Sequence, residues 1–383
     1  MTRRWICLLL AVLTMLTCTA CGEEEAPGDV ALGYDDPYLY TQIGGVLHRI
    51  SPHSASVTPV CPDPLCKHED ETCPFYGVES IQFAGQYLYY LKMSRNWDGT
   101  SALCRFDLKN GTFRELYRPE AGTLSNFYAG EDYVFLNLGG VDEEWNNYYH
   151  ILRLDPDSGE AVQLTKEPLQ ESQIPLLIEN GRVYWSGDGH YSTDFEYQDR
   201  KDGDRGYSPN VTRQDHVYEL ESGEIKGEEG YKQMCFRVVR VDVKTGERVT
   251  VTEDAASAPI LYEDRVIYGK LEKLRYLGKV YDEETDSWKE QYDKYGGKLY
   301  ICNGDGTGER VLCDLGDAPY AFTVSHGILG GKTGVGDWIA LWVFHYVPAD
   351  ENDPEKVKRA ENAYLLVNVK TGEWKVAERE TRS

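Results

Sequence analysis

Two stretches of the sequence are nearly the same, Val239-Arg-Val-Asp-Val-Lys-Thr-Gly-Glu-Arg-Val-Thr-Val251 and Leu365-Leu-Val-Asn-Val-Lys-Thr-Gly-Glu-Trp-Lys-Val376. In both, apolar residues alternate with polar ones on either side of a polar turn, which is the period of a strand with one buried face. Asp or Asn opens the turn with a side chain that can cap backbone N–H groups, and Gly supplies positive φ. Each stretch therefore predicts a β-hairpin.

This hairpin recurs along the chain. A strand, a polar turn and a second strand occur six times, and five of the six turns contain Gly. Ahead of most copies lies another pair of alternating segments, such as Ile81–Gly85 with Tyr87–Tyr90. Two hairpins form a four-stranded sheet of roughly fifty to sixty residues, the size of one propeller blade. The six copies span residues 47–60, 103–116, 151–164, 239–251, 299–312 and 365–376.

Six such units account for nearly the whole chain. We therefore predict an all-β fold, a six-bladed β-propeller of four-stranded antiparallel blades that forms a single domain over residues 35–383. The composition agrees, because 28 Tyr suit strands and 37 Gly suit tight turns. The first unit lacks a clear innermost strand, and residues 29–33 are expected to supply it.

The N-terminus has the features of an export signal. A basic start precedes an apolar run over residues 5–17, which is too short to span a bilayer. The run leads into Cys18-Thr-Ala-Cys21-Gly, which resembles a bacterial lipobox. This predicts a signal peptide over 1–20, lipidation of Cys21 and an acidic tether over 21–34. Because Cys18 stands where a lipobox usually has Leu, lipidation at Cys18 and plain secretion stay open. We expect a lipid-anchored protein of the cell membrane that faces the extracytoplasmic side.

The charge of the chain limits its partners. It carries 64 Asp and Glu against 40 Lys and Arg, a formal net charge of −24. No basic stripe is present to neutralise phosphates, which argues against nucleic acid. The same balance argues against direct electrostatic adhesion to anionic lipid, so contact with the membrane is expected through the lipid anchor. A net negative charge keeps an exported protein soluble, and this is sufficient to explain the acidic composition.

The irregular segments are expected to gather on one face of the propeller. In a blade whose strands are lettered A to D from the axis outward, the B–C and D–A connections lie on one face. Polar inserts near 187–233, 271–297 and 347–360 all fall between predicted B and C strands. The second of them has alternating aromatic residues and predicts a projecting hairpin. Elaborated loops on one side of a rigid scaffold are typical of a binding surface, although such loops also tolerate insertions for no functional reason.

A cluster of cysteines and a histidine follows the first hairpin, in Cys61-Pro-Asp-Pro-Leu-Cys66-Lys-His68-Glu-Asp-Glu-Thr-Cys73-Pro-Phe75. Three thiolates and an imidazole suit a tetrahedral zinc ion or another thiophilic metal. The spacing does not match a standard zinc-finger frame. A local disulfide in an exported protein is the interpretation we place ahead of a structural metal, and a reactive thiol or redox role is the third. The D–A loop over 61–75 thus predicts zinc, a disulfide or a redox site.

The number of cysteines bears on this choice. Beyond Cys21 there are seven, so they cannot all pair, and a site with three cysteines and a histidine would leave four. Among the rest, Cys302 and Cys313 flank a Gly-rich turn on paired strands and are a possible cross-strand disulfide. The seven are Cys61, Cys66, Cys73, Cys104, Cys235, Cys302 and Cys313.

Two further sets of residues are candidates. Some six-bladed propellers are hydrolases that hold calcium in the axial pore with side chains at the start of their innermost strands, and Glu79, Asn126 and Gln173 fall near such starts. Four aromatic residues are candidates for a glycan-binding platform, although Tyr and Trp in strands more often pack in the core. They are Trp145, Tyr148, Tyr149 and Trp185. The sequence has no His-Glu-x-x-His, Gly-x-Ser-x-Gly or Walker motif.

The Cys-x-Asp-Pro-Leu-Cys-x-His…Cys-Pro-Phe segment, the Tyr-rich blades and the Asp-x-x-x-Gly turns together resemble a group of Gram-positive surface lipoproteins. The propeller of that group is similar to those of the low-density-lipoprotein receptor and of TolB. The resemblance covers most of the chain after the signal. It implies the fold and the location, and it implies no particular chemistry.

Three functions follow as hypotheses. The first is a non-catalytic lipoprotein that binds a protein or glycan partner through the loop-rich face. The second is a metal-dependent hydrolase with its site in the axial pore. The third is a metal or redox role centred on the Cys/His loop.

Overall fold

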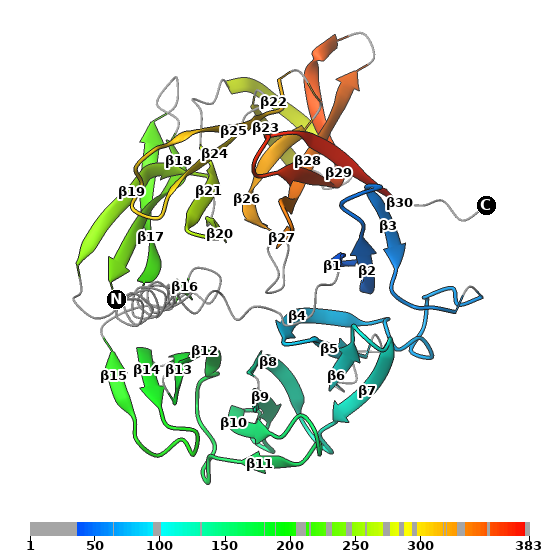
Figure 1. Cartoon of the computed structure of the whole chain (residues 1–383), viewed down its shortest axis with the longest axis vertical. Helices are drawn as coiled ribbons and strands as arrows, with labels where there is room; N and C mark the ends of the chain where they lie inside the picture. Colours follow the sequence, from blue (N-terminus) through cyan, green and yellow to red (C-terminus); the bar gives the residue numbers. More distant parts are fainter. Residues whose placement is uncertain are drawn as a thin grey trace, which may run out of the picture.

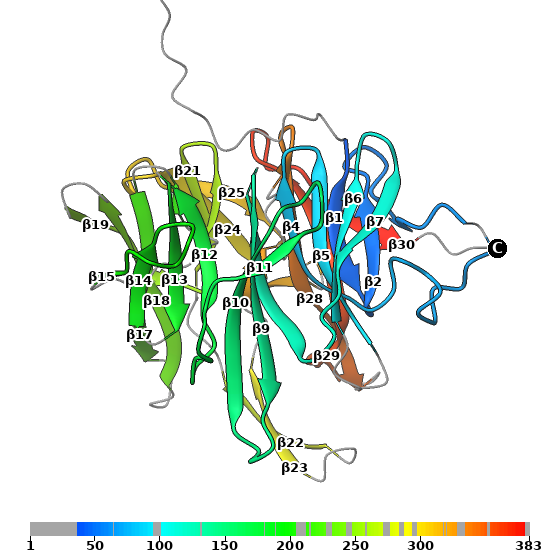
Figure 2. The ribbon, with the colours of Figure 1, turned by 90° about the horizontal axis from the view of Figure 1, so that it is seen from below.

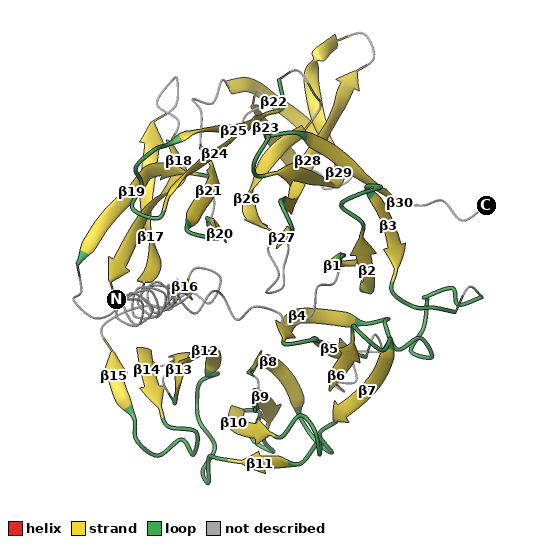
Figure 3. Cartoon of the chain, viewed as in Figure 1, coloured by secondary structure: helices red, strands yellow, loops and turns green. Residues whose placement is uncertain are grey.

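In the computed structural model the chain folds into a ring of β-sheets around a central axis (Figure 1). The part of the chain that the structure describes is 37–379, without 64, 95–100, 131, 180, 188, 204–211, 214–215, 227–231, 243–246, 257–258, 271–275, 283–286, 293–296, 317, 319, 328–333 and 351–352. Within these residues the regular elements are strands, as Figure 3 shows. No helix among them is long and apolar enough to cross a membrane. The predicted signal, lipidation and tether residues lie outside the described part.

The described residues form seven blades, which we number in chain order. Blade 1 has three strands, β1 (Leu39–Ile43), β2 (Val46–Ile50) and β3 (Ser56–Pro59). Blade 2 comprises β4 (Val78–Ala84), β5 (Tyr87–Met93), β6 (Ser101–Asp107) and β7 (Thr112–Tyr117). Blade 3 comprises β8 (Thr123–Ala129), β9 (Val134–Val141), β10 (Asn147–Leu154) and β11 (Ala161–Gln163). Blade 4 comprises β12 (Ile174–Glu179), β13 (Arg182–Gly187), β14 (Gly189–Thr193) and β15 (Lys201–Gly203).

The remaining three blades complete the ring. Blade 5 comprises β16 (Thr212–Arg213), β17 (His216–Lys226), β18 (Lys232–Asp242) and β19 (Arg248–Ala255). Blade 6 comprises β20 (Ile260–Tyr262), β21 (Arg265–Gly269), β24 (Lys298–Asn303) and β25 (Arg310–Asp314). Blade 7 comprises β26 (Tyr320–Gly327), β28 (Trp338–Asp350), β29 (Asp353–Asn368) and β30 (Trp374–Arg379), with the short β27 (Gly334–Val335) paired to β28. Consecutive strands within each blade are antiparallel.

The propeller class is confirmed, but the predicted count of six blades is wrong. The stretch 187–233, expected to be an insert in one blade, contains β14 to β17. These strands complete blade 4 and begin blade 5, so a single predicted unit is two blades. These strands carry no repeated turn signal, although each of them pairs with its neighbour in the sequence. Blade 1 has three described strands, and its β2–β3 hairpin has the same backbone hydrogen bonds as the outer hairpin of blade 3. The innermost strand predicted at 29–33 lies outside the described residues.

The turn chemistry that predicted the hairpins is present. In blade 2 the Asp107 carboxylate accepts hydrogen bonds from the N–H groups of Lys109 and Asn110, both at 2.9 Å, and its carbonyl accepts from Gly111 at 2.8 Å. The turns that begin at Asp155 and Asn368 repeat this pattern. Capping of these N–H groups by the first residue is what makes the five-residue turn specific.

The core lies between blades. The described residues form six buried apolar clusters, and each cluster joins two neighbouring blades. This follows from strand alternation, because each blade has two faces and both pack on a neighbour. The ring closes where Leu39, Ile50 and Val57 of blade 1 pack on Ala340 and Leu366 of blade 7. At this junction β3 and β30 also pair in parallel over two residue pairs.

Long hairpins extend from one face of the ring. Figure 2 shows the ends of β9–β10, β22–β23 and β28–β29 on the lower side. Strands β22 (Tyr276–Asp282) and β23 (Ser287–Tyr292) form a two-stranded antiparallel sheet of their own within the predicted insert 271–297. The predicted insert 347–360 belongs to the long β28–β29 hairpin. These hairpins all connect second and third strands of their blades.

Candidate metal centre

The Cys/His loop leaves β3 and enters β4, and it is built from two turns of the same kind. Asp63 and Asp70 each accept, through a carboxylate oxygen, the N–H two residues ahead at 2.9 Å. Their carbonyl oxygens accept the N–H groups of Cys66 at 3.2 Å and Cys73 at 3.3 Å. The repeated Asp-x-x-Cys spacing therefore ends each turn on a cysteine. The two Asp-x-x-Cys spacings are visible in the sequence, and they predict the turns that bring the cysteines together.

A second repeat, Cys-Pro, determines which backbone N–H groups contact two of the sulfur atoms. Cys61 and Cys73 are each followed by proline, which has no N–H to donate. The next N–H groups, those of Asp63 and Phe75, donate to the two sulfur atoms. Hydrogen bonds of this kind favour the thiolate form and orient the sulfur atom.

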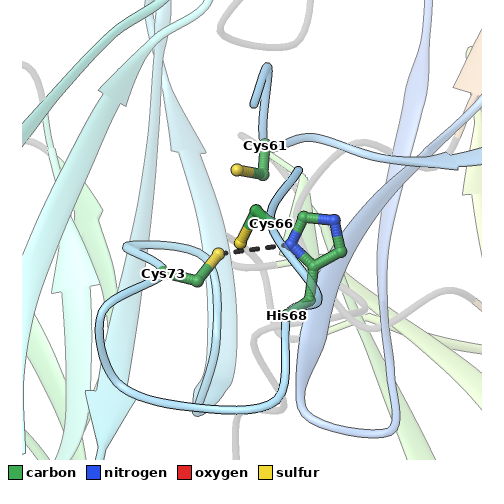
Figure 4. A group of neighbouring side chains, drawn as sticks. All are labelled: Cys61, Cys66, His68 and Cys73. Carbon is green, nitrogen blue, oxygen red and sulfur yellow. Dashed lines mark hydrogen bonds between the residues drawn. The ribbon is translucent and has the colours of Figure 1, made fainter. Parts of the chain in front are cut away.

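The four predicted ligands converge. One ligand atom from each of Cys61, Cys66, His68 and Cys73 lies within 4.8 Å of the others, and Figure 4 shows the side chains pointing toward one another. His68 adopts φ of +57°, which is uncommon for a residue other than glycine. In this conformation its Nδ1 lies 3.4 Å from the Cys73 sulfur. The tight local turn that the spacing demanded is thus made by His68 itself.

Burial separates the four residues into two pairs. Cys61 and Cys73 are buried, whereas Cys66 and His68 are half-exposed. Burial raises the pKa of Cys61, and it raises the pKa of Cys73 to about 12. Both thiols are thus neutral at pH 7 without a cation. A coordinated metal ion reverses this direction, because a ligating thiol is deprotonated by the charge of the ion.

The loop is fixed to blade 2 by its last residues. The Phe75 side chain is 2% exposed, and its ring centroid lies 5.2 Å from that of Phe106 and 6.1 Å from that of Phe113. Tyr90 donates from its hydroxyl to the Pro74 carbonyl at 2.9 Å. Lys92 donates from its ammonium to the Cys73 carbonyl at 3.1 Å. None of these anchors was identified from the sequence, because their partners lie more than fifteen residues away.

This arrangement can hold a thiophilic metal ion. None of the three cysteines forms a disulfide in this structure. A disulfide would use two of them and leave the third cysteine and His68 beside it. Within the described residues, this cluster is the one group of three or more potential metal ligands.

The predicted pairing of Cys302 with Cys313 is not formed. Cys313 lies opposite Leu299 in the β24–β25 ladder. Cys302 packs in the cluster between blades 5 and 6, and Cys313 in the cluster between blades 6 and 7. The two sulfur atoms therefore belong to opposite faces of the sheet, and both thiols are free.

The three pore candidates do not gather into a metal site. Glu79 is exposed on β4 and Asn126 is half-buried on β8. Gln173 is 4% exposed, and its side chain is used within blade 4, where Oε1 accepts from the Tyr191 hydroxyl at 2.7 Å and Nε2 donates to the Glu171 carbonyl at 3.1 Å. No group of potential metal ligands includes them in the described chain.

The aromatic candidates divide by exposure. Trp185 is fully buried between blades 3 and 4, with its ring edge-on to Phe135 at 5.9 Å, so it belongs to the core and cannot contact a glycan. Tyr148 and Tyr149 are half-buried on β10. Trp145, at the tip of the β9–β10 hairpin, is 87% exposed.

Comparison with known proteins gives a likeness of fold. No protein-family model matches the chain, and no curated protein matches it. TolB from Acinetobacter baumannii is 13% identical with a TM-score of 0.39, over 70% of this chain and 61% of that one. Oligogalacturonate lyase from Vibrio parahaemolyticus is 12% identical with a TM-score of 0.41, over 82% and 86%. We take nothing about activity from these matches.

Proposed function

We propose that the protein is a non-catalytic, lipid-anchored scaffold on the extracytoplasmic side of the membrane, which binds a protein partner through the face that carries the long hairpins. The observation that supports this most directly is the tip of the β9–β10 hairpin. Trp145 is 87% exposed there and Val141 is 53% exposed, whereas large apolar side chains are otherwise mostly buried in the core. An exposed Trp in a projecting position is the kind of residue that anchors protein interfaces.

The tip is held in one conformation. Asp142 accepts, through Oδ1, the N–H groups of Glu144 at 2.9 Å and Asn146 at 2.8 Å, and its carbonyl accepts the N–H of Trp145 at 3.1 Å. Trp145 itself has φ of +67°, a conformation with a cost for a bulky residue. The turn therefore fixes the backbone of Trp145 at the tip of the hairpin. A preordered contact residue loses little entropy on binding, which favours a function for the exposed ring.

The convex shape of the tip favours a protein over a glycan, because small ligands and sugars bind mainly in concave sites. The hydrolase hypothesis has no comparable support, since the pore candidates are not assembled into a site in the described residues. Export and lipidation at Cys21 remain part of the proposal. They rest on the N-terminal sequence alone.

Site-specific crosslinking tests the proposal. A photo-crosslinking amino acid is placed at position 145 and, as a matched control, at Val311, which is 44% exposed on the outer strand of blade 6. On intact cells we expect one defined protein adduct from position 145 and none from 311. Trp145→Ala should abolish binding of that partner, and Val311→Ser should leave it unchanged. Equal adducts from both positions, or none from position 145, would refute the proposal. If the wild type bound a glycan and Trp145→Ala did not, the partner would be a glycan and not a protein.

A further inference from the structure

The ligand atoms of the Cys/His loop are already close to the arrangement that a zinc ion requires. In a tetrahedral site with Zn–S distances of about 2.3 Å, neighbouring ligand atoms lie about 3.8 Å apart. The four atoms here lie within 4.8 Å of one another. Movements of about 1 Å in flexible side chains would therefore complete the site.

We propose that Cys61, Cys66, His68 and Cys73 bind one zinc ion in a closed, structural centre that fixes the connection between the outer strand of blade 1 and the first strand of blade 2. Four protein ligands leave no position for water or substrate, which is the distinction between structural and catalytic zinc. The centre therefore stabilises the fold and does no chemistry on a substrate.

The position of the loop supports the structural role. The loop connects β3, the outer strand of blade 1, to β4, the first strand of blade 2. Phe75 extends from the loop onto blade 2, where it contacts Tyr90 of β5, Phe106 of β6 and Phe113 of β7. In the same cluster Cys61 and Cys73 pack with side chains of β1 and β2. The loop thus packs between blades 1 and 2.

The loop has little apolar packing of its own before Cys73. Its exposed residues include Leu65, which is 88% exposed, and Lys67, Glu69 and Glu71. Hydrophobic burial therefore cannot hold residues 62–72 in place. Two Asx turns and a metal ion can, because metal binding by a small loop supplies free energy that its core does not.

The direct test measures metal content and thiol accessibility on the full chain, extracted in detergent without chelator. We expect about one zinc ion per chain. Alkylation mapped by mass spectrometry should leave Cys61, Cys66 and Cys73 unlabelled until a strong zinc chelator is added. Chelation should also expose residues 61–76 to limited proteolysis. A disulfide between any two of the three cysteines, or labelling of all three without chelator and no bound metal, would overturn the proposal.

Variants separate metal binding from general damage to the fold. His68→Ala should lose the zinc, whereas His68→Cys should retain it, because four cysteines form a common structural zinc site. Cys235→Ser is the matched control, since Cys235 is a buried thiol in blade 5 away from the loop. Cobalt replacement should give the intense visible bands of a tetrahedral thiolate site in the wild type and in His68→Cys. Equal zinc content in His68→Ala and the wild type would contradict the assignment of His68 as a ligand.

Discussion

The turn glycines allow a quantitative test of the way the blades pack. Gly372 has φ of +75°, and a Cβ added there would lie 2.0 Å from the Leu312 carbonyl oxygen of the neighbouring blade. Gly111 has φ of +66° and occupies the same place in its turn, but an added Cβ would meet nothing within 4 Å. The pair therefore separates the cost of the backbone conformation from the cost of the contact between blades.

The expected magnitudes follow from these two terms. Alanine in the left-handed region costs about 1–2 kcal/mol, and the smaller entropy of its unfolded chain returns about 0.4–1 kcal/mol. Gly111→Ala should therefore destabilise the protein by about 1 kcal/mol. In Gly372→Ala the neighbouring strand must also move away, because ordinary contact begins at 3.4 Å and the Cβ would lie at 2.0 Å. Overpacking of this kind adds about 1–3 kcal/mol, so we expect a total of about 2–4 kcal/mol.

Urea unfolding monitored by circular dichroism measures both variants against the wild type. Gly372→Ala should lower the midpoint clearly more than Gly111→Ala, with similar slopes. Gly159→Ala should fall between them, because its added Cβ would lie 2.9 Å from the Leu116 carbonyl oxygen. Equal losses at Gly111 and Gly372 would refute the reasoning, since the turn would then be sensitive to its backbone conformation alone.

Two further predictions concern buried and charged groups. Burial raises the pKa of Cys313 to about 11. Cys302 and Cys313 should therefore resist alkylation at pH 8 in the folded protein and react after unfolding without a reductant. If the unfolded protein reacted only after reduction, the two cysteines would form a disulfide. Burial alone would raise the pKa of Glu309, but hydrogen bonds from the Tyr268 hydroxyl and the Lys270 ammonium lower it below its ordinary value. The ionised Glu309 carboxylate contributes its full stabilisation above about pH 5, and this contribution is lost as the pH falls through the pKa of the folded state. Between about pH 5 and pH 3 the free energy of unfolding should therefore fall more in the wild type than in Glu309→Gln. Parallel pH profiles of the two would contradict the assignment.

The propeller class could be predicted from sequence because its signal is local. Alternation and the capped Gly turn are each contained in about five residues, and the turn at Asp107 forms as its sequence indicates. The blade count could not be predicted in the same way. Strands β14 to β17 pair with their neighbours in the sequence, but they are rich in polar residues and resemble an insert more than the apolar strands of the other blades.

The candidate site shows a similar division. The residue types and spacing of the Cys/His loop correctly marked four residues that the fold brings together. The sequence did not show that His68 would take positive φ, or that Phe75 would anchor the loop on blade 2. Trp185 failed as a surface candidate because an aromatic residue on a strand faces either solvent or the next blade, and only the positions of Phe135 and Tyr191 decide which.

The location of the Cys/His loop at blade 1 is consistent with where the ring needs support. A propeller is stable when every blade packs on two neighbours, so the blade with the smallest sheet contributes the least on both sides. Blade 1 is that blade, and its pairing to blade 7 through β3 and β30 extends over only two residue pairs. On that side a cluster of Leu39, Ile50 and Val57 with blade 7 closes the ring. On the other side the junction with blade 2 depends on the loop, because Cys61, Cys73 and Phe75 are buried in it. A metal ion bound there would hold the first blade against the second, while the hairpins on the exposed face remain free to contact a partner.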